Sequence, residues 1–399
     1  MLKRTIGILT LFILTSCANY KLNIAKDIEN EPITAENGDI VHTMYLIGDS
    51  GNAKAKKDSL PALVVLERHL LAAGENSSVV FLGDNIYPNG LAPKREKEEH
   101  KKDLIRLDAQ LDILKNYKGK PYFIAGNHDW AKWGLDGVQR QEKYVEKVLD
   151  KGDTFVPDAG CGDPEEIEIN DNLVILAIDS QWFLQDWEGE TEINDGCEVK
   201  SRTTFMKWFE EALKSNRNNN VVIVMHHPLY SNGPHGGGTT LKQHIFPLTQ
   251  LYDNLYIPLP GVGTIGAFLR SVTGLKQDLS HVNYKEMKRG LLAGANKNGN
   301  FIFASGHDHG LQYFEKNGHS FIVSGAGSKR EPTSMKNGAL FTYGQYGFTQ
   351  LDFYGDGSVN MKCWAAYTNK TGEVVFERKI KGPLPSAGAE VPNSFPEFE

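Results

Sequence analysis

Val79-Val80-Phe81-Leu82-Gly83-Asp84-Asn85-Ile86-Tyr87 joins a strand-like run to two candidate metal ligands. Its first four residues form an apolar run rich in valine, as a buried strand requires, and Gly83 ends that run. Asp84 follows at once and Tyr87 lies three residues further on, so both can reach the same metal ion. If the stretch stood alone, a capped turn with a tyrosine in the core would explain the same residues.

Four other strings of oxygen and nitrogen donors also follow apolar runs, and this repetition favours a metal site. They are Gly48-Asp49-Ser50-Gly51, Gly126-Asn127-His128-Asp129, His226-His227-Pro228 and Gly306-His307-Asp308-His309. Together the five strings supply carboxylates, an amide oxygen, imidazoles and a phenol, which are enough ligands for two adjacent metal ions. A pair of metal ions is suited to the hydrolysis of phosphate esters.

Within these strings, the alternation of side chains along an extended chain selects individual residues. Asn127 would face the metal, and its neighbour His128 would therefore face the substrate. Of the two adjacent histidines after the fifth apolar run, only one can face the site, and His226 is the choice. His307 and His309 lie two residues apart, so on an extended segment both imidazoles point the same way, one for each metal.

The apolar runs alternate with helical patterns, which is typical of parallel β-α-β units and predicts an α/β fold. The runs cover 41–47, 79–82, 122–125, 173–178, 221–225 and 301–304, and the helical patterns cover roughly 54–73, 94–116, 137–150 and 203–215. In such sheets ligands bind beyond the carboxyl ends of the strands. Because every donor string begins where an apolar run stops, we expect all five strings at one rim.

Length and composition fit one catalytic domain in an ordinary globular protein. The 399 residues are 40% apolar and 23% charged, and the net charge of −7 comes without a basic stretch, which argues against nucleic acid as a partner. The donor strings span 49–309 without a linker, and alternating strands after residue 310 close the domain. We expect a catalytic domain over 41–370, then a C-terminal strand and a proline-rich tail over 371–399.

The N-terminal segment predicts export and lipid attachment. Residues 1–16 combine Lys3-Arg4 with a short apolar run, as in a signal peptide, and Leu14-Thr15-Ser16-Cys17 resembles a bacterial lipobox. Acylation of Cys17 would anchor the protein in the membrane of the bacterial cell envelope, at the outer membrane or the periplasmic face, through a polar tether over 17–40. A buried N-terminal helix with an incidental cysteine is the alternative.

The remaining cysteines carry two further expectations. Cys161 and Cys197 lie in one irregular region, where an exported protein could join them in a disulfide. Two unpaired surface thiols are the alternative. Cys363 lies in a strand-like run and is expected to be a buried apolar residue.

Taken together, the donor strings resemble those of the calcineurin-like metallophosphoesterases, and among them the purple acid phosphatases of the tartrate-resistant type. The resemblance covers about residues 41–330 and continues more weakly to about 370. Tyr87 marks the subgroup, since purple acid phosphatases use a tyrosine there as a phenolate ligand to Fe(III). Ser305–Tyr313 and Ser324–Gly327 also resemble the sequence around that type's last motif. The resemblance implies a metallophosphoesterase-type four-layer α/β/β/α sandwich with a dinuclear metal site at the carboxyl-terminal rim of the strands.

Carried over by position, the resemblance implies two metal ions that share one carboxylate. Fe(III) would be held by Asp49, Asp84, Tyr87 and His309, and a divalent ion (iron, zinc or manganese) by Asp84, Asn127, His226 and His307. His128 corresponds to a histidine that contacts the substrate. The type has a second such histidine on the loop after the His226 strand. Its counterpart here is open between Asn232, which is nearest in position, and His235.

Residues 251–290 depart from the tartrate-resistant type, which lacks an apolar stretch at this place. The stretch includes Leu255–Pro260 and Ile265–Leu269. It predicts either a lid or partner surface, or an insertion that packs against the domain.

The expected activity is that of a metal-dependent acid phosphatase, which hydrolyses phosphate monoesters through a hydroxide bound at the dinuclear metal centre. His128 or His235 would protonate the leaving alkoxide, and His128 and Asn232 would bind the substrate. Two other functions fit the same residues. A phosphodiesterase or nucleotidase could use them with manganese or zinc, and a surface binding lipoprotein could keep them as a vestigial metal site.

Overall fold

The computed structural model describes residues 18–26, 28, 38–54, 60–186, 193–246, 248, 255–259 and 275–384. Its strands are β1 (Asn23–Ile24), β2 (Ile40–Ile47), β3 (Ser77–Phe81), β4 (Lys120–Phe123), β5 (Glu165–Asn170), β6 (Leu173–Ala177), β7 (Asn220–Val224), β8 (Ile302–Ser305), β9 (Leu311–Lys316), β10 (His319–Ser324), β11 (Ala339–Tyr343), β12 (Gly347–Tyr354), β13 (Val359–Ala366) and β14 (Gly372–Lys381). Its helices are α2 (Pro61–Ala72), α3 (Lys97–Leu111), α4 (Asn127–Trp130), α5 (Gly134–Leu149), α6 (Ser180–Leu184), α7 (Arg202–Ser215), α8 (Leu241–Ile245) and α10 (Val282–Asn298), with the short 3-10 helices η3 (Asp112–Leu114) and η4 (Asp158–Gly160).

The described strands form two mixed sheets. One has the order β14-β13-β12-β2-β3-β4, and the other has the order β1-β11-β9-β10-β8-β7-β6-β5. Strands β2, β3 and β4 are parallel neighbours in the first sheet, and β6, β7, β8 and β10 are parallel neighbours in the second. Antiparallel strands extend both sheets, as the alternating pattern after residue 310 predicts. The expected β-α-β units are thus divided between two sheets.

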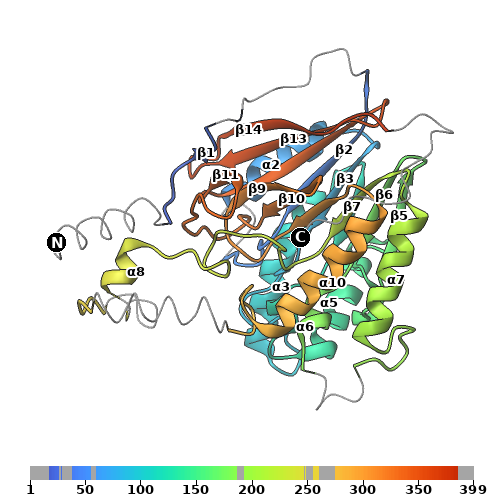
Figure 1. Cartoon of the computed structure of the whole chain (residues 1–399). Helices are drawn as coiled ribbons and strands as arrows, with labels where there is room; N and C mark the ends of the chain where they lie inside the picture. The colour runs from blue at the N-terminus through green and yellow to red at the C-terminus, as the bar shows by residue number, and fades with distance from the viewer. Residues whose placement is uncertain are drawn as a thin grey trace.

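Alternating side chains explain why the two sheets pack face to face. Met44 and Leu46 of β2 belong to a buried cluster that also contains Val224 of β7, so these side chains fill the space between the sheets. Tyr45 points the other way and lies beside His69 of α2, with ring centroids 6.0 Å apart. Helices therefore cover the outer faces, with α2 on one sheet and the adjacent helices α7 and α10 on the other (Figure 1). The four-layer α/β/β/α sandwich is confirmed.

The predicted helical patterns all contain helices, but the first helix starts later than expected. The pattern over 54–73 corresponds to α2, which begins at Pro61. Proline suits the first turn of a helix because its φ is already close to the helical value. An N–H group at this position would have no hydrogen-bond partner within the helix, so nothing is lost when proline lacks it. Residues 55–59 lie outside the described part of the chain.

Part of the segment predicted as a tether is packed in the structure. Asn23 and Ile24 pair with β11, and Asn19 exchanges two backbone hydrogen bonds of 2.8 Å with Thr333. Residues 18–26 are therefore not a free tether, because even a polar segment can pair its backbone with a sheet edge. Cys17 and the predicted signal peptide lie outside the described residues. Within the described residues, no helix combines the length and apolar character needed to cross a bilayer.

The structure contains the expected disulfide. It joins Cys161 to Cys197, which excludes the alternative of two unpaired thiols. Cys363 is a free cysteine and is 1% exposed, as expected for an apolar residue in a strand.

The described end of the insertion packs against the domain. Tyr284 of α10 donates a hydrogen bond of 2.6 Å to the carbonyl oxygen of Pro228. This contact favours the packed alternative for residues 275–290. Further along, β14 pairs with β13, and residues 385–399 of the predicted tail lie outside the described part.

Candidate metal centre

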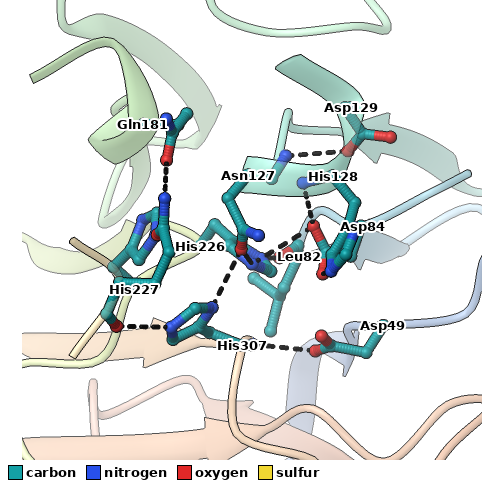
Figure 2. A network of polar contacts seen from close by, with 12 residues as sticks. Asp49, Leu82, Asp84, Asn127, His128, Asp129, Gln181, His226, His227 and His307 are labelled. Carbon is teal, nitrogen blue, oxygen red and sulfur yellow. Dashed lines mark hydrogen bonds and ion pairs between the residues drawn. The ribbon is translucent and has the colours of Figure 1, made fainter. Parts of the chain in front are cut away.

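The predicted donor residues meet at one rim, although they come from two sheets. Strands β2, β3 and β4 end shortly before Asp49, Asp84 and Asn127, and strands β7 and β8 of the facing sheet end shortly before His226 and His307. Because the sheets pack face to face, the carboxyl ends of both parallel runs point into the same region. Figure 2 shows these five side chains turned toward one another.

Asn127, His226 and His307 form the first cluster. His226 Nδ1 donates to the carbonyl oxygen of Leu82 at 2.8 Å, which leaves the lone pair of Nε2 facing Asn127 Oδ1 at 3.0 Å. His307 Nε2 donates to the carbonyl oxygen of Gln277 at 2.9 Å, and its Nδ1 faces the same Asn127 oxygen at 3.0 Å. The Asn127 oxygen and one nitrogen of each imidazole thus face one another (Figure 2), and a cation bound between them would stabilise this arrangement.

Asp49, Tyr87 and His309 form the second cluster. The phenol of Tyr87 donates to Asp49 Oδ1 at 2.9 Å, and His309 Nε2 lies 3.1 Å from the Tyr87 oxygen. On the other side of the ring, His309 Nδ1 lies 3.0 Å from Glu331 Oε2. Burial alone would lower the pKa of His309, but Glu331 and Asp49 raise it to about 10. A carboxylate behind an imidazole orients the ring and keeps the opposite nitrogen available for a metal.

Asp84 lies between the two clusters. Its Oδ1 is 3.4 Å from His226 Nε2 in the first cluster, and its carboxylate also interacts with Tyr87 in the second. The residue is 1% exposed. Burial alone would raise the pKa of Asp84, but His226 and His128 hold it below its usual value. This position meets the requirement for a carboxylate that two cations share.

Three candidate ligands have a backbone conformation that residues other than glycine rarely adopt. The φ angles of Asp49, Asp84 and His307 are 59°, 55° and 69°. Each costs on the order of 1–3 kcal/mol, and such strain is concentrated at functional sites. The φ of His307 also shows that the predicted extended conformation of residues 307–309 is wrong. The chain turns at His307, and this turn, not strand alternation, places the rings of His307 and His309 at different clusters.

Glycine allows two of the donor strings to approach closely. A Cβ added at Gly126 would lie 2.3 Å from the backbone nitrogen of Asp84 and 2.4 Å from its Oδ1, which is closer than atoms can pack. Asp129 then joins the strings, because it accepts backbone hydrogen bonds from Gly126 at 2.8 Å and Asn85 at 3.1 Å. The same string carries Asn127, so this contact fixes Asn127 relative to Asp84.

His128 lies beside the clusters, but the reason predicted for its direction is wrong. Residues Asn127–Trp130 form the one-turn helix α4, where the alternation of a strand does not apply. The His128 backbone donates to Asp84 Oδ1 at 2.9 Å, and ring Nδ1 lies 2.6 Å from the carbonyl oxygen of Pro88. Ring Nε2 lies 4.0 Å from Asp84 Oδ2, and the side chain is 34% exposed. The Nε2 edge can therefore reach a molecule bound at the centre.

Of the two candidates on the loop after β7, the structure brings only His235 to the clusters. The His235 ring packs on the His307 ring with centroids 4.1 Å apart, and its Nδ1 lies 2.9 Å from Asp278 Oδ1. Asn232 is 1% exposed, its Nδ2 donates to a backbone carbonyl at 2.6 Å and its Oδ1 accepts from Asn337 at 2.8 Å. These bonds hold the loop together, so the placement of Asn232 at the substrate is wrong.

A supporting layer behind the first cluster escaped the sequence analysis. The ring nitrogens of His227 contact Ser180 Oγ at 2.8 Å and Gln277 Oε1 at 2.6 Å, so both are engaged. Ser180 comes shortly after the apolar run 173–178, just as each donor string comes after an apolar run. Its position in the sequence could therefore have identified it as a residue of the site. Gln277 belongs to the insertion, where no pattern indicated a role. Its backbone and side chain nevertheless hold two imidazoles.

Lys329 is a second residue that the sequence analysis missed. Its Nζ lies 3.2 Å from the centroid of the Tyr87 ring. Burial lowers the pKa of Lys329, whereas Asp84 and Asp49 favour its charged form. Among the described residues, no carboxylate lies within ion-pair distance of this ammonium group. The positively charged side chain of Lys329 therefore lies at the edge of the second cluster, where it could attract a phosphate group.

The donor chemistry fits metal ions. Among the described residues, Asp49, Asp84 and His226 have ligand atoms within 4.8 Å of one another, as do His226, His227 and His307. Buried carboxylates, imidazoles, an amide oxygen and a phenol suit first-row transition metals. His227 has both nitrogens engaged, so the ligand atoms that remain are those of the two clusters and Asp84.

Comparisons with known proteins agree with this geometry. The model of the calcineurin-like phosphoesterase family matches residues 42–257. The chain is 24% identical over 353 residues to purple acid phosphatase 17 of Arabidopsis thaliana, covering 84% of this chain and 80% of that protein. It is 25% identical over 323 residues to tartrate-resistant acid phosphatase type 5 of Homo sapiens, covering 76% of this chain and 78% of that protein.

Solved structures share the fold. Purple acid phosphatase PPD1 from yellow lupin (Lupinus luteus) seeds matches with a TM-score of 0.53 at 13% identity, covering 91% of this chain and 57% of that chain. GAP50, the anchor in the inner membrane complex of Plasmodium, matches with a TM-score of 0.51 at 14% identity, covering 90% of this chain and 100% of that chain. At such low identity these likenesses show the fold alone.

Proposed function

Because the chain belongs to the calcineurin-like phosphoesterase family, we propose that it is a metal-dependent phosphatase that hydrolyses phosphate monoesters at a dinuclear centre. One observation carries the proposal: Asp84 is buried beside two clusters of side chains whose oxygen and nitrogen atoms are suited to bind metal ions. The preference for monoesters draws its support from the similarity to the two acid phosphatases.

The proposed ligand sets follow the two clusters. Fe(III) would be held by Asp49, Asp84, Tyr87 and His309, and divalent iron, zinc or manganese by Asp84, Asn127, His226 and His307. A phenolate is a hard anionic ligand, and it supports the assignment of trivalent iron to the Tyr87 side. When bound, the two ions would supply Lewis-acid chemistry, which polarises the phosphate and lowers the pKa of water.

The protein's own residues would bind and orient the ester. With both ring nitrogens protonated, His128 would donate from Nε2 to a phosphate oxygen, while Nδ1 donates to the carbonyl oxygen of Pro88. His235 is anchored at Nδ1 by Asp278, which leaves its other ring nitrogen for the leaving group. We propose that His128 or His235 gives the leaving alkoxide its proton.

Lys329 would add one more positive charge for the phosphate. We expect Lys329→Met to raise KM for a phosphate monoester by about tenfold with little change in kcat, since the charge would attract substrate and transition state alike. Steady-state kinetics at fixed ionic strength would measure the effect. Arg330→Met is the matched control, because Arg330 is exposed and lies near the rings of Tyr20 and Tyr346. An unchanged KM in Lys329→Met would show that Lys329 does not bind the substrate.

A panel of esters tests the proposed function. Purified protein should hydrolyse p-nitrophenyl phosphate much faster than bis(p-nitrophenyl) phosphate, and should lose this activity on chelation and regain it when iron with zinc or manganese is returned. Faster hydrolysis of the diester, with manganese or zinc in both positions, would favour the phosphodiesterase alternative. Failure of the metal-loaded protein on every ester would favour a binding lipoprotein.

We further propose that the protein is exported and anchored by lipid at the bacterial cell envelope. The Cys161–Cys197 disulfide supports an oxidising compartment. Cys17→Ala should move the protein from the membrane fraction to the soluble fraction of lysed cells, because the acyl chains would be lost. Cys363→Ala serves as the control and should stay with the membranes. An unchanged membrane fraction for Cys17→Ala would contradict lipidation at this cysteine.

A further inference from the structure

A cavity of about 350 Å³ lies next to the first cluster. Its walls come from the loop after β7, from the end of the insertion and from α10, and include Tyr230, Pro234, His235, Leu279, Lys288 and Asn337. One of these, His235, also packs on His307 with ring centroids 4.1 Å apart. His235 therefore lies at both the cavity and a candidate metal ligand, so the cavity is close to the place where a substrate phosphate would bind.

The wall of the cavity includes the cationic side chain of Lys288. Lys288 Nζ lies 3.6 Å from the centroid of the Tyr230 ring, and among the described residues no carboxylate is within ion-pair distance of it. The other charged group of the wall, Asp278, is already engaged with His235 at 2.9 Å. Burial and Lys316 lower the pKa of Lys288 to about 8, so its ammonium group is still charged at neutral pH. An unpaired charge of this kind attracts an anion.

The other walls of the cavity suit a carbon skeleton. Tyr230, Pro234 and Leu279 line the same cavity as His235 and Lys288 and present aromatic and aliphatic surface to it. A ligand that fills this space would place its apolar part against these residues and an anionic group at Lys288.

We propose that this cavity receives the leaving group of the substrate, and that the preferred substrates are phosphate monoesters whose alcohol carries a second anionic group. This inference rests on the proposed function, because it places the reacting phosphate at the metal clusters. A carboxylate and a second phosphate share the chemistry that Lys288 recognises.

Three matched esters test the inference: phenyl phosphate, 4-carboxyphenyl phosphate and the bisphosphate of hydroquinone. We expect wild-type protein to prefer one or both charged esters over phenyl phosphate by about tenfold in kcat/KM, the effect of one well-placed charge. Lys288→Met should abolish the preference, so that kcat/KM for the charged esters falls to the value for phenyl phosphate in the same variant. Lys285→Met, at an exposed position of the same helix, should keep it. The better of the two charged esters identifies the anionic group.

Two results would overturn the inference while leaving the phosphatase proposal intact. In one, wild-type protein hydrolyses phenyl phosphate and shows no preference for a charged ester. In the other, Lys288→Met retains the full preference. If wild-type protein hydrolyses none of the esters, the proposed function fails, and calorimetric titration with 4-hydroxybenzoate then decides about the cavity. Binding that Lys288→Met loses would support an anion site, and absence of binding to wild-type protein would exclude it.

Discussion

Asp84→Asn will remove most of the phosphatase turnover and, in the same protein, most of the bound metal. The substitution keeps the size of the side chain but removes the charge that two cations would share. We expect kcat/KM to fall by about 10³-fold or more, because the interactions lost are those that stabilise charge in the transition state. Elemental analysis of the purified variant should find less than half of the metal content of the wild-type protein.

Another buried carboxylate provides the control for this result. Asp103 of α3 is 2% exposed and accepts a hydrogen bond from the Ala92 backbone at 3.0 Å, so Asp103→Asn disturbs a similar environment remote from the ligands. It should fold with less stability but with full metal content. If Asp84→Asn kept its turnover and both ions, Asp84 would not be the shared ligand, and the two-cluster arrangement would lose its centre.

Tyr87→Phe will abolish visible absorption in protein purified under air. A phenolate bound to Fe(III) gives a charge-transfer band, and Tyr87 is the phenol that contacts both Asp49 and His309. Removing one oxygen atom removes the band completely, whereas the ring still fills its buried place. Metal analysis beside the spectrum will establish whether iron remains bound without the phenolate.

The spectrum of Tyr87→Phe has a matched control in a distant tyrosine. Tyr117 donates to Ser77 Oγ at 3.0 Å, away from the clusters, so Tyr117→Phe should keep the band unchanged. A band that persists in Tyr87→Phe would show that another ligand produces it. An active but colourless wild-type protein would instead indicate manganese or zinc in both positions and favour the phosphodiesterase or nucleotidase alternative.

Much of the fold followed from local patterns, and the resemblance to calcineurin-like phosphoesterases is confirmed by the family match. The apolar runs became strands, and the donor strings lie at the carboxyl ends of those strands. This prediction succeeded because an apolar run and the turn residues that bound it are features of a few neighbouring positions. That two facing sheets share the strands came from the resemblance and could not be derived from the runs themselves.

Two of the errors share one physical cause, because the alternation of side chains along a strand does not continue beyond the end of the strand. His128 lies on the one-turn helix α4, and His307 has a φ of 69°, so neither residue continues the geometry of the strand before it. Asn232 was assigned by its spacing from His226, but the hydrogen bonds of the loop turn its amide inward. The spacing between two residues predicts the direction of their side chains only where the backbone conformation between them is known.

Ligand type and position after a strand are both local properties, so the sequence alone indicates which side chains can bind metals. Which nitrogen of each imidazole faces the site depends on partners that are brought together when the sheets pack. His226, His307 and His309 are oriented by Leu82, Gln277 and Glu331, respectively. The first two of these partners are separated from their histidines by 144 and 30 positions along the chain. A hydrogen bond between such distant residues forms only after the sheets have packed, so no pattern of neighbouring residues can encode it.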